Sequence, residues 1–207
     1  MDNKIVRENT FKAPDGKVRC AWCSATSEYV DYHDREWGFP VSDDQRLFEK
    51  ICLESFQSGL SWRTILAKRE NFRNAFCHFD FEQVARFTHK DVNSLLKNEG
   101  IVRHRGKIEA VINNAKRAVE LVNQEGSLAT FFWCFEPDES KLPPPQSVTT
   151  SEESIALSKA LKKLGWKFVG PTTLYAFMQA MGLINDHAEG CITRCEVNKA
   201  RKRFKRP

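Results

Sequence analysis

Four potential metal ligands lie in two pairs at opposite ends of the chain. Cys20 and His33 stand near the start, and His187 and Cys191 stand near the end, at the i, i+4 spacing that places two side chains on one face of a helix. Two cysteines and two histidines form a complete tetrahedral ligand set for zinc. Closing so long a loop costs about 4–5 kcal/mol, whereas a structural zinc contributes about 10–16 kcal/mol in small peptides. A metal clasp, one ion joining the two ends, is therefore energetically favourable.

The spacing alone leaves other assignments open. Cys23 forms a Cys-x-x-Cys motif with Cys20, which is also typical of thiol-redox proteins, and Cys195 extends the second pair by four residues. A redox motif of this kind usually accompanies a βαβ pattern, which we do not find in the sequence. Ordinary buried thiols and histidines explain the spacing as well as zinc does.

A second group of residues has the chemistry to enclose a purine. It consists of four aromatic residues and one carboxylate: Tyr29, Tyr32, Trp37, Trp62 and Glu54. Aromatic rings offer stacking and cation–π attraction, and a carboxylate accepts hydrogen bonds from the N–H groups of a positively charged base. Glu54 lies about 100° from the centre of the apolar stripe of its predicted helix, at the flank of the core. We place Tyr32 and Trp37 on an irregular segment before that helix. Singly, each residue is more often a core aromatic or a solvated carboxylate.

A short turn bounded by glycines is the candidate contact with a nucleic-acid backbone. Residues 100–107 read Gly-Ile-Val-Arg-His-Arg-Gly-Lys and lie between two predicted helices. Such a turn presents backbone amides and a helix N-terminus that can bind a phosphate, and its basic side chains add positive charge. An αα-hairpin with a solvated turn is the alternative. The predicted contacts are Gly100, Ile101, Val102, Arg103, His104, Arg105 and Lys107.

Helix start and stop signals recur from Ser42 onward and predict an all-α fold. A capping box of Ser42 and Gln45 is expected to begin the helix that carries Glu54. The other expected helices begin at Ser61, Asp80, Thr88 (with Asp91 completing its capping box), Arg105, Ser127, Ser151, Thr172 and near Asn185. The stretch Pro137–Thr149, with three consecutive prolines, is a predicted surface loop.

The two ends of the chain differ from the part between them. Residues 1–18 are polar and predict a disordered extension, residues 19–195 a helical domain, and residues 196–207 a basic tail. The net charge is +5, but the last nine residues carry +6, which leaves −1 for all preceding residues. Overall charge is therefore no evidence that the folded body binds DNA. The tail is a flexible arm that attracts phosphate, a nuclear-targeting signal, or inert solvated charge.

Composition narrows the cellular context. The sequence has no apolar run of membrane-spanning length and no signal-peptide core at its start, so we expect a soluble cytoplasmic protein without membrane contact. Seven cysteines, an odd number without a dense framework, favour free thiols or metal binding over disulfides. Nothing in the sequence demands an oligomer, and we expect a monomer.

The chain resembles the 3-methyladenine DNA glycosylase I family, a bacterial branch of the helix-hairpin-helix DNA glycosylases. The resemblance covers about residues 19–195 and rests on collinear motifs: Tyr-His-Asp-Arg-Glu-Trp-Gly at 32–38, Ile-Cys-Leu-Glu at 51–54, Gly-Leu-Ser-Trp at 59–62, residues 100–108, Lys-Phe-Val-Gly at 167–170, Asn-Asp-His at 185–187 and Gly-Cys at 190–191. It implies a helix-hairpin-helix glycosylase fold in which a zinc clasp joins the N- and C-terminal segments.

The resemblance also implies roles for individual residues. It selects one structural zinc held by Cys20, His33, His187 and Cys191, and leaves Cys23 and Cys195 spare. It assigns Glu54, Tyr32 and Trp62 to recognition of the extruded base, with Glu54 the candidate catalytic residue, and Trp37 and Tyr29 to the walls of the pocket. Gly59 and Leu60 resemble the family's turn that wedges into the duplex.

The implied function is hydrolysis of the N-glycosidic bond of 3-methyladenine in alkylated double-stranded DNA. The expected enzyme would act in bacterial base-excision repair, at the nucleoid in the cytoplasm, with free 3-methyladenine as its product. No aspartate occurs between Asp91 and Asp138, downstream of the hairpin, where related superfamily members use one, and this agrees with the branch that the motifs resemble. No lysine in the motifs is an evident Schiff-base nucleophile. We therefore expect a monofunctional enzyme without strand cleavage. The alternatives are a noncatalytic, zinc-stapled helix-hairpin-helix DNA-binding module and a thiol-redox protein.

Overall fold

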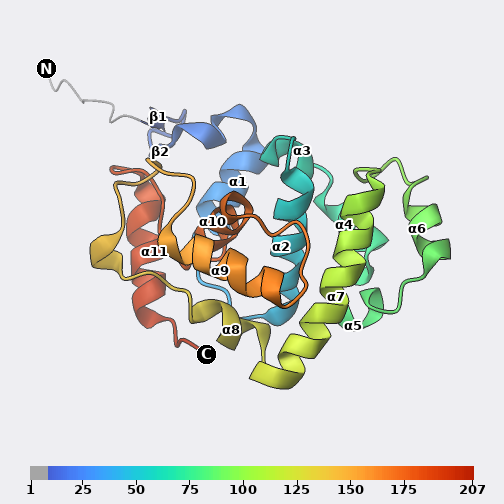
Figure 1. The fold of residues 1–207 in the computed structure, drawn as a ribbon. Coiled ribbons are helices and arrows are strands. Elements are labelled where there is room, and N and C mark those ends of the chain that lie inside the picture. The colour runs from blue at the N-terminus through green and yellow to red at the C-terminus, as the bar shows by residue number, and fades with distance from the viewer. Residues whose placement is uncertain (1–8) are drawn as a thin grey trace, which may run out of the picture. The chain divides into compact units, whose positions relative to one another are not determined.

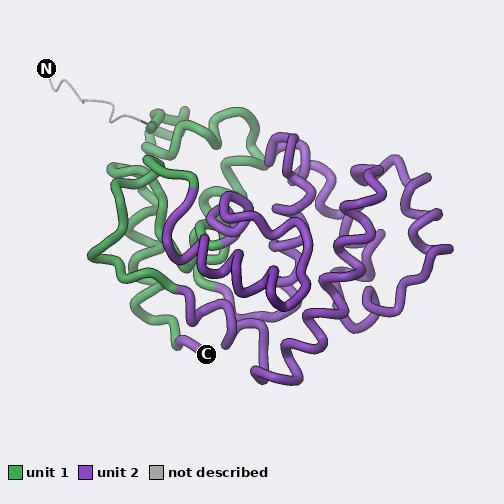
Figure 2. The backbone as a smooth tube through the Cα atoms, viewed as in Figure 1, with its two compact units in different colours: residues 1–40, 136–149, 178–205 green, residues 41–135, 150–177, 206–207 purple. Residues whose placement is uncertain are grey.

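The computed structural model describes residues 9–207, and most of the regular structure in this range is helical (Figure 1). The chain divides into two compact units, coloured green and purple in Figure 2. Unit 1 comprises residues 1–40, 136–149 and 178–205, and unit 2 comprises residues 41–135, 150–177 and 206–207. Within the described range, no helix is both long enough and apolar enough to cross a membrane.

Unit 1 begins with a small antiparallel sheet. Strand β1 (Thr10–Lys12) pairs with β2 (Val18–Cys20), and Pro14-Asp15-Gly16 forms the turn between them. The predicted disorder is therefore wrong for residues 9–18, because a Pro-Asp-Gly turn brings two short extended segments together. The all-α prediction misses this sheet as well. Residues 1–8 of the predicted extension lie outside the described residues.

The helical part of unit 1 includes elements that carry or adjoin the predicted metal ligands. Its elements are the 3-10 helix η1 (Ala21–Ala25), α1 (Ser27–Arg35), the 3-10 helix η3 (Glu139–Lys141) and α11 (Ile192–Arg203). Helix α1 begins at Thr26, whose side chain accepts the amide N–H of Tyr29. The prediction of an irregular segment is wrong for Tyr32, which lies on α1, because the largely polar sequence of this helix hides its periodicity. It is confirmed for Trp37, which lies in the turn after α1.

The basic C-terminal segment is mostly helical. Val197 on α11 is fully buried, and Arg201 is buried as well, where it pairs with Glu136 at 2.9 Å and donates a hydrogen bond to the carbonyl of Gly182. The predicted flexible arm at 196–207 is therefore wrong up to residue 203, because this part of the chain packs one apolar and one basic side chain inward. The basic side chains that remain exposed are Lys199, Lys202, Arg203, Lys205 and Arg206.

Unit 2 is built from helices. They are α2 (Asp44–Gln57), α3 (Trp62–Leu66), α4 (Arg69–Ala75), the 3-10 helix η2 (Cys77–Phe79), α5 (Phe81–Val84), α6 (His89–Leu95), α7 (Arg105–Glu125), α8 (Leu128–Trp133), α9 (Glu152–Lys163) and α10 (Pro171–Ala180), whose last residues belong to unit 1. The predicted caps Ser61 and Asp80 and the Thr88–Asp91 capping box are confirmed. The predicted Ser42–Gln45 box is wrong, since Asp43 accepts the amide of Arg46 and begins α2.

Helix α2 forms the centre of unit 2. Nine of its fourteen residues are buried, and phenylalanine side chains from α2, α4 and η2 pack on one another around it. The fully buried members of this cluster are Phe48, Phe56, Phe72, Phe76 and Phe79. Burying large aromatic side chains at native packing density makes a rigid base for residues at the flank of the helix.

Candidate functional site

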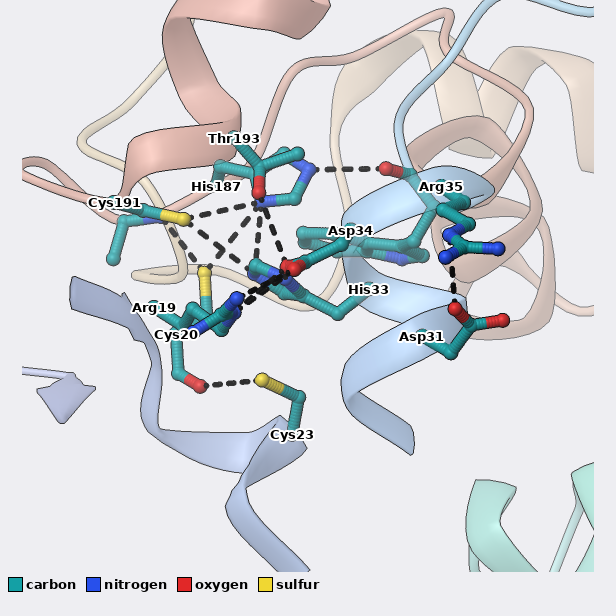
Figure 3. Close-up of polar contacts among 12 residues, drawn as sticks. Arg19, Cys20, Cys23, Asp31, His33, Asp34, Arg35, His187, Cys191 and Thr193 are labelled. Carbon is teal, nitrogen blue, oxygen red and sulfur yellow. Dashed lines mark hydrogen bonds and ion pairs between the residues drawn. The ribbon is translucent and has the colours of Figure 1, made fainter. Parts of the chain in front are cut away.

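The four predicted metal ligands lie together in unit 1 (Figure 3). All four are buried, and their donor atoms lie within 4.8 Å of one another. Cys191 Sγ is 3.5 Å from His33 Nε2 and 3.6 Å from His187 Nδ1, Cys20 Sγ is 3.7 Å from His187 Nδ1, and the two imidazole nitrogens are 3.1 Å apart. A tetrahedral zinc with usual bond lengths separates a sulfur and a nitrogen ligand by about 3.6 Å and two nitrogens by about 3.3 Å. These four separations are compatible with tetrahedral geometry, and the four residues could hold one metal ion. The prediction that the two pairs meet is confirmed.

Both imidazoles are oriented by hydrogen bonds on the side away from this cluster. His33 Nδ1 lies 2.8 Å from Asp34 Oδ1, and His187 Nε2 lies 3.0 Å from the carbonyl oxygen of Trp37. An N–H that donates to each of these acceptors leaves His33 Nε2 and His187 Nδ1 with a free lone pair directed at the cluster. Such outer partners are typical of histidines that bind a metal.

Asp34 is itself held by a buried guanidinium. Arg19 on β2 is 4% exposed, and its Nε and Nη2 atoms lie 2.8–3.0 Å from the carboxylate oxygens of Asp34. Burial alone would raise the pKa of Asp34, but hydrogen bonds from Arg19 and His33 outweigh it, and the pKa is lowered. Asp34 therefore stays ionised and keeps its role as acceptor for His33. Sequence reasoning missed this pair, although Asp34 directly follows a predicted ligand.

The structure separates the competing sets of thiols. The pKa of Cys191 is far below its usual value, because Cys20 donates a hydrogen bond to it and His187 and His33 add to the effect. A thiolate is the form that binds a metal. Cys23 instead donates its S–H to the Cys20 carbonyl at 3.1 Å, and burial raises its pKa to about 12. Cys195 is exposed on α11. Neither belongs to the cluster.

His187 lies on a loop rather than on a helix, so the predicted helical spacing of His187 and Cys191 is wrong. Helix α11 begins only at Ile192, with Cys191 as its N-cap residue. Arg194 donates hydrogen bonds to the carbonyls of Asn185 and His187 at 3.1 and 2.6 Å, and Asn185 Nδ2 donates to the carbonyl of Arg194 at 3.0 Å. These side chains satisfy the loop's backbone groups, so no helical turn is needed there.

An aromatic group packs directly against the metal-ligand cluster. Trp37 lies 4.6 Å from the ring of His187, and Trp22 lies 5.0 Å from both Trp37 and Tyr29 and 6.4 Å from Tyr32, measured between ring centroids. Sequence reasoning missed Trp22, whose position between two cysteines was the available signal. Three predicted pocket residues and the cluster thus belong to one packed group in unit 1.

The predicted catalytic carboxylate is buried at the flank of α2 in unit 2. Glu54 is 6% exposed and forms an ion pair with Lys50, one helical turn earlier, at 2.7 Å. Lys50 Nζ also lies 3.3 Å from the centroid of the Trp62 ring. A buried carboxylate and an indole ring therefore face one cation, which is the combination that a positively charged purine requires. The predicted convergence of this trio with Tyr29, Tyr32 and Trp37 involves both units and stays a prediction.

The predicted wedge turn follows the C-terminus of α2. Gly59 has a φ of +80°, and Leu60 is 43% exposed. Lys107 Nζ donates to the carbonyls of Phe56 and Ser58 at 2.9 and 2.5 Å, and burial lowers the pKa of this lysine. The prediction that Lys107 adds to a surface patch is therefore wrong. Its ammonium points inward and stabilises the carbonyl end of α2 before the turn.

The hairpin between α6 and α7 exposes three basic side chains. Arg103, His104 and Arg105 are exposed, whereas Ile101 is buried. His104 is the N-cap of α7 and accepts the amide of Lys107 at 3.2 Å. The amides of Gly100, Ile101 and His104 are hydrogen-bonded within the turn, so the expected availability of these amides is wrong. The exposed ion pairs of Arg103 with Glu99 and of Arg105 with Glu109 are weak enough to exchange for a phosphate.

Sequence reasoning also missed an exposed aromatic beside this hairpin. Phe168 is 42% exposed, has a φ of +57° and lies 6.4 Å from the His104 ring. Its carbonyl accepts from Ser55 Oγ at 3.0 Å, and the buried Asn114 exchanges two hydrogen bonds with the backbone of Lys167 at 2.8 and 2.9 Å. The surrounding contacts therefore impose a strained backbone that presents this ring to solvent.

Comparison with known proteins finds relatives that match most of this chain. The family model described as methyladenine glycosylase matches residues 22–194. A protein of Haemophilus influenzae named DNA-3-methyladenine glycosylase is 49% identical over 178 residues, which cover 84% of this chain and 96% of that protein. A crystal structure of a 3-methyladenine DNA glycosylase I matches this chain with a TM-score of 0.78 at 48% identity. The match covers 84% of this chain and 98% of the chain in that structure. A Staphylococcus aureus structure that describes 3-methyladenine recognition has a TM-score of 0.78 at 36% identity, over 85% and 96% of the two chains.

Proposed function

The chain belongs to the methyladenine glycosylase family, and from this premise we propose that it releases 3-methyladenine from alkylated double-stranded DNA. The proposal makes it a bacterial base-excision repair enzyme that works as a monomer at the nucleoid. The observation that carries it is the buried Glu54 carboxylate, which shares one cation with the indole of Trp62. For a positively charged alkylated purine, Glu54 provides the opposite charge and Trp62 provides a stacking surface.

The chemistry follows from the charge of the substrate. Alkylation at N3 makes the adenine base positively charged and therefore a good leaving group, so a strong general acid is not essential. The bond between the base nitrogen and C1′ of the sugar breaks with its electron pair going to the base, and water then adds to C1′ and loses a proton. We assign Glu54 to recognition of the base in its cationic form before this step.

The remaining parts of the site extract and hold the nucleotide. We assign Tyr32 and Trp62 to the faces of the extruded base, and Trp37 and Tyr29 to the wall of the pocket. Leu60 fills the gap left in the duplex, since an exposed apolar side chain can replace the stacking of a missing base. Arg103, His104 and Arg105 on the hairpin neutralise backbone phosphates. The enzyme does not cleave the DNA strand, and the product is an abasic site.

One zinc ion is the proposed cofactor, held by Cys20, His33, His187 and Cys191. With four protein ligands there is no open position for water, so the ion's contribution is structural. Its support is the fit of the four donors together with the hydrogen bonds that orient both imidazoles. We expect elemental analysis of the purified protein to give one zinc per chain, and a metal-free native protein would refute this assignment.

Substitution of Glu54 tests the proposed recognition role. We expect Glu54→Gln, which keeps the shape but removes the charge, to weaken binding of free 3-methyladenine by about tenfold or more, measured by titration calorimetry. Glu49→Gln is a matched control, because Glu49 lies on the same helix and pairs with Arg73 at 2.7 Å. Equal affinity of Glu54→Gln and the unmodified protein would remove Glu54 from the pocket.

A further inference from the structure

Lys50 makes two interactions at once in the proposed base site. Its Nζ atom lies 2.7 Å from Glu54 Oε1 and 3.3 Å from the centroid of the Trp62 ring. Lys50 is 5% exposed and Glu54 6%, so the pair is almost completely removed from water. An ion pair and a cation–π contact in so dry a place are much stronger than the same contacts at the surface.

We propose that Lys50 is an internal competitor for the base site: its ammonium takes the place of the cationic purine between Glu54 and Trp62, and base binding displaces it. The inference rests on the proposed function, because it takes Glu54 and Trp62 as the pair that recognises the base. A cationic purine offers the carboxylate the same charge as the ammonium and adds an aromatic face and N–H donors. It can therefore replace both interactions of Lys50, which an uncharged base cannot do.

This competition affects both affinity and turnover. Displacing Lys50 costs every base the same free energy and lowers all affinities by one factor, so the preference for cationic over neutral bases comes from Glu54 itself. When the glycosidic bond breaks, its electron pair stays with the base and cancels the base's positive charge. The neutral product then keeps only hydrogen bonds to Glu54 in place of an ion pair, so Lys50 competes more effectively for the carboxylate. The same lysine that opposes binding thus promotes product release.

Replacement of Lys50 by an uncharged residue of similar length is the direct test. In Lys50→Met we expect the 3,9-dimethyladeninium cation, which carries the charge of the alkylated nucleoside without its sugar, to bind about tenfold tighter or more. The inhibition constant of 3-methyladenine in the excision assay should fall by a similar factor. Lys159→Met, which removes an exposed lysine from α9, is the matched control and should change neither value.

Folding of the variants is checked by thermal unfolding with and without the cation. Removing Lys50 leaves the Glu54 carboxylate buried without its counter-charge, so Lys50→Met should melt at a lower temperature and gain more from the added cation than the unmodified protein does. Lys50→Gln, which keeps a hydrogen-bond donor for Glu54, serves as the second variant if Lys50→Met does not fold.

The outcomes separate this inference from the proposed function. Unchanged or weaker binding of the cation by the folded Lys50 variants, while Glu54→Gln still loses base binding, would overturn the competitor role alone. If Glu54→Gln binds 3-methyladenine as well as the unmodified protein does, the proposed recognition site fails first. Tighter binding in the Lys50 variants together with loss of binding in Glu54→Gln would support both.

Discussion

Gly38 brings the backbone close to a proposed metal ligand. It has a φ of +87°, and a Cβ atom at this position would lie 3.1 Å from His187 Nε2 and 3.2 Å from its Cδ2 atom. A side chain here would strain the backbone, because φ is positive, and would contact the His187 imidazole. This imidazole is oriented by its hydrogen bond with the carbonyl of the neighbouring Trp37. The close approach explains at the residue scale why the sequence has glycine directly after Trp37.

We expect Gly38→Ala to destabilise the protein by about 1–3 kcal/mol and to reduce its zinc content. The reason is that the added methyl group crowds the His187 ring and must shift it by a few tenths of an ångström from its place in the cluster. The measurements are denaturant unfolding and elemental analysis. Gly126→Ala is a suitable control, since Gly126 also has a φ of +87° but no atom within 4 Å of the added Cβ. Equal zinc loss in both variants would contradict the role of Gly38.

Residue types predicted the metal cluster well and its surroundings poorly. Cysteine and histidine can be recognised as potential metal ligands from the sequence alone. The resemblance could therefore select Cys20, His33, His187 and Cys191 before the fold was known. The oxygen atoms that orient the imidazoles were not accessible in this way, because one is the backbone carbonyl of Trp37, which carries no signature in the sequence. Lys50 was missed for a related reason: a lysine on a helix normally points to solvent.

At the scale of elements, Lys107 connects the hairpin with the wedge turn. It lies in the first turn of α7, and its ammonium binds the last carbonyls of α2, those of Phe56 and Ser58, directly before Gly59 and Leu60. Two segments with proposed DNA contacts therefore share one buried cation. Helix C-termini favour positive charge, and the two carbonyls need a donor once they are buried.

We expect Lys107→Met to cost about 1–3 kcal/mol of stability, because it leaves buried carbonyls without a donor. Excision from duplex DNA should fall more than binding of free 3-methyladenine, since the turn loses its position while the base pocket remains. Lys116→Met on the exposed side of the same helix is the control. A parallel loss of both activities would show that Lys107 supports unit 2 as a whole.

Elements with strong local signals were predictable, and those shaped by distant contacts were not. Ser61, Asp80 and Thr88 cap helices as expected, because N-capping is decided within one turn of the chain. The segment before Cys191 was predicted as helix but is a loop, because Arg194 on the next helix binds its carbonyls. The hairpin at residues 9–20 was missed although its Pro-Asp-Gly turn is a recognised signal.

At the scale of the molecule, the proposed ion joins segments that are far apart in the chain but lie within unit 1. It links β2 and α1 to the loop before α11. Unit 2 has its own aromatic core around α2. Loss of the metal should therefore loosen one unit and leave the packing within the other.

We expect Cys191→Ala to lose its zinc and at least about 3 kcal/mol of stability, with faster amide hydrogen exchange in α1 and α11. Helices α2 and α7 should keep most of their protection. Cys195→Ala is the control, because this exposed thiol lies four residues further on and outside the cluster. A zinc content and exchange pattern identical in the two variants would refute the structural role of the ion.

Incubation with methylated DNA shows directly whether this molecule removes a base. Duplex DNA carrying labelled methyl groups is incubated with the unmodified protein, and the released bases and the strand are analysed separately. We expect free 3-methyladenine to be released and an abasic site to remain in an uncut strand. Tight binding to the DNA without release of any base would contradict this expectation and would support a noncatalytic DNA-binding module.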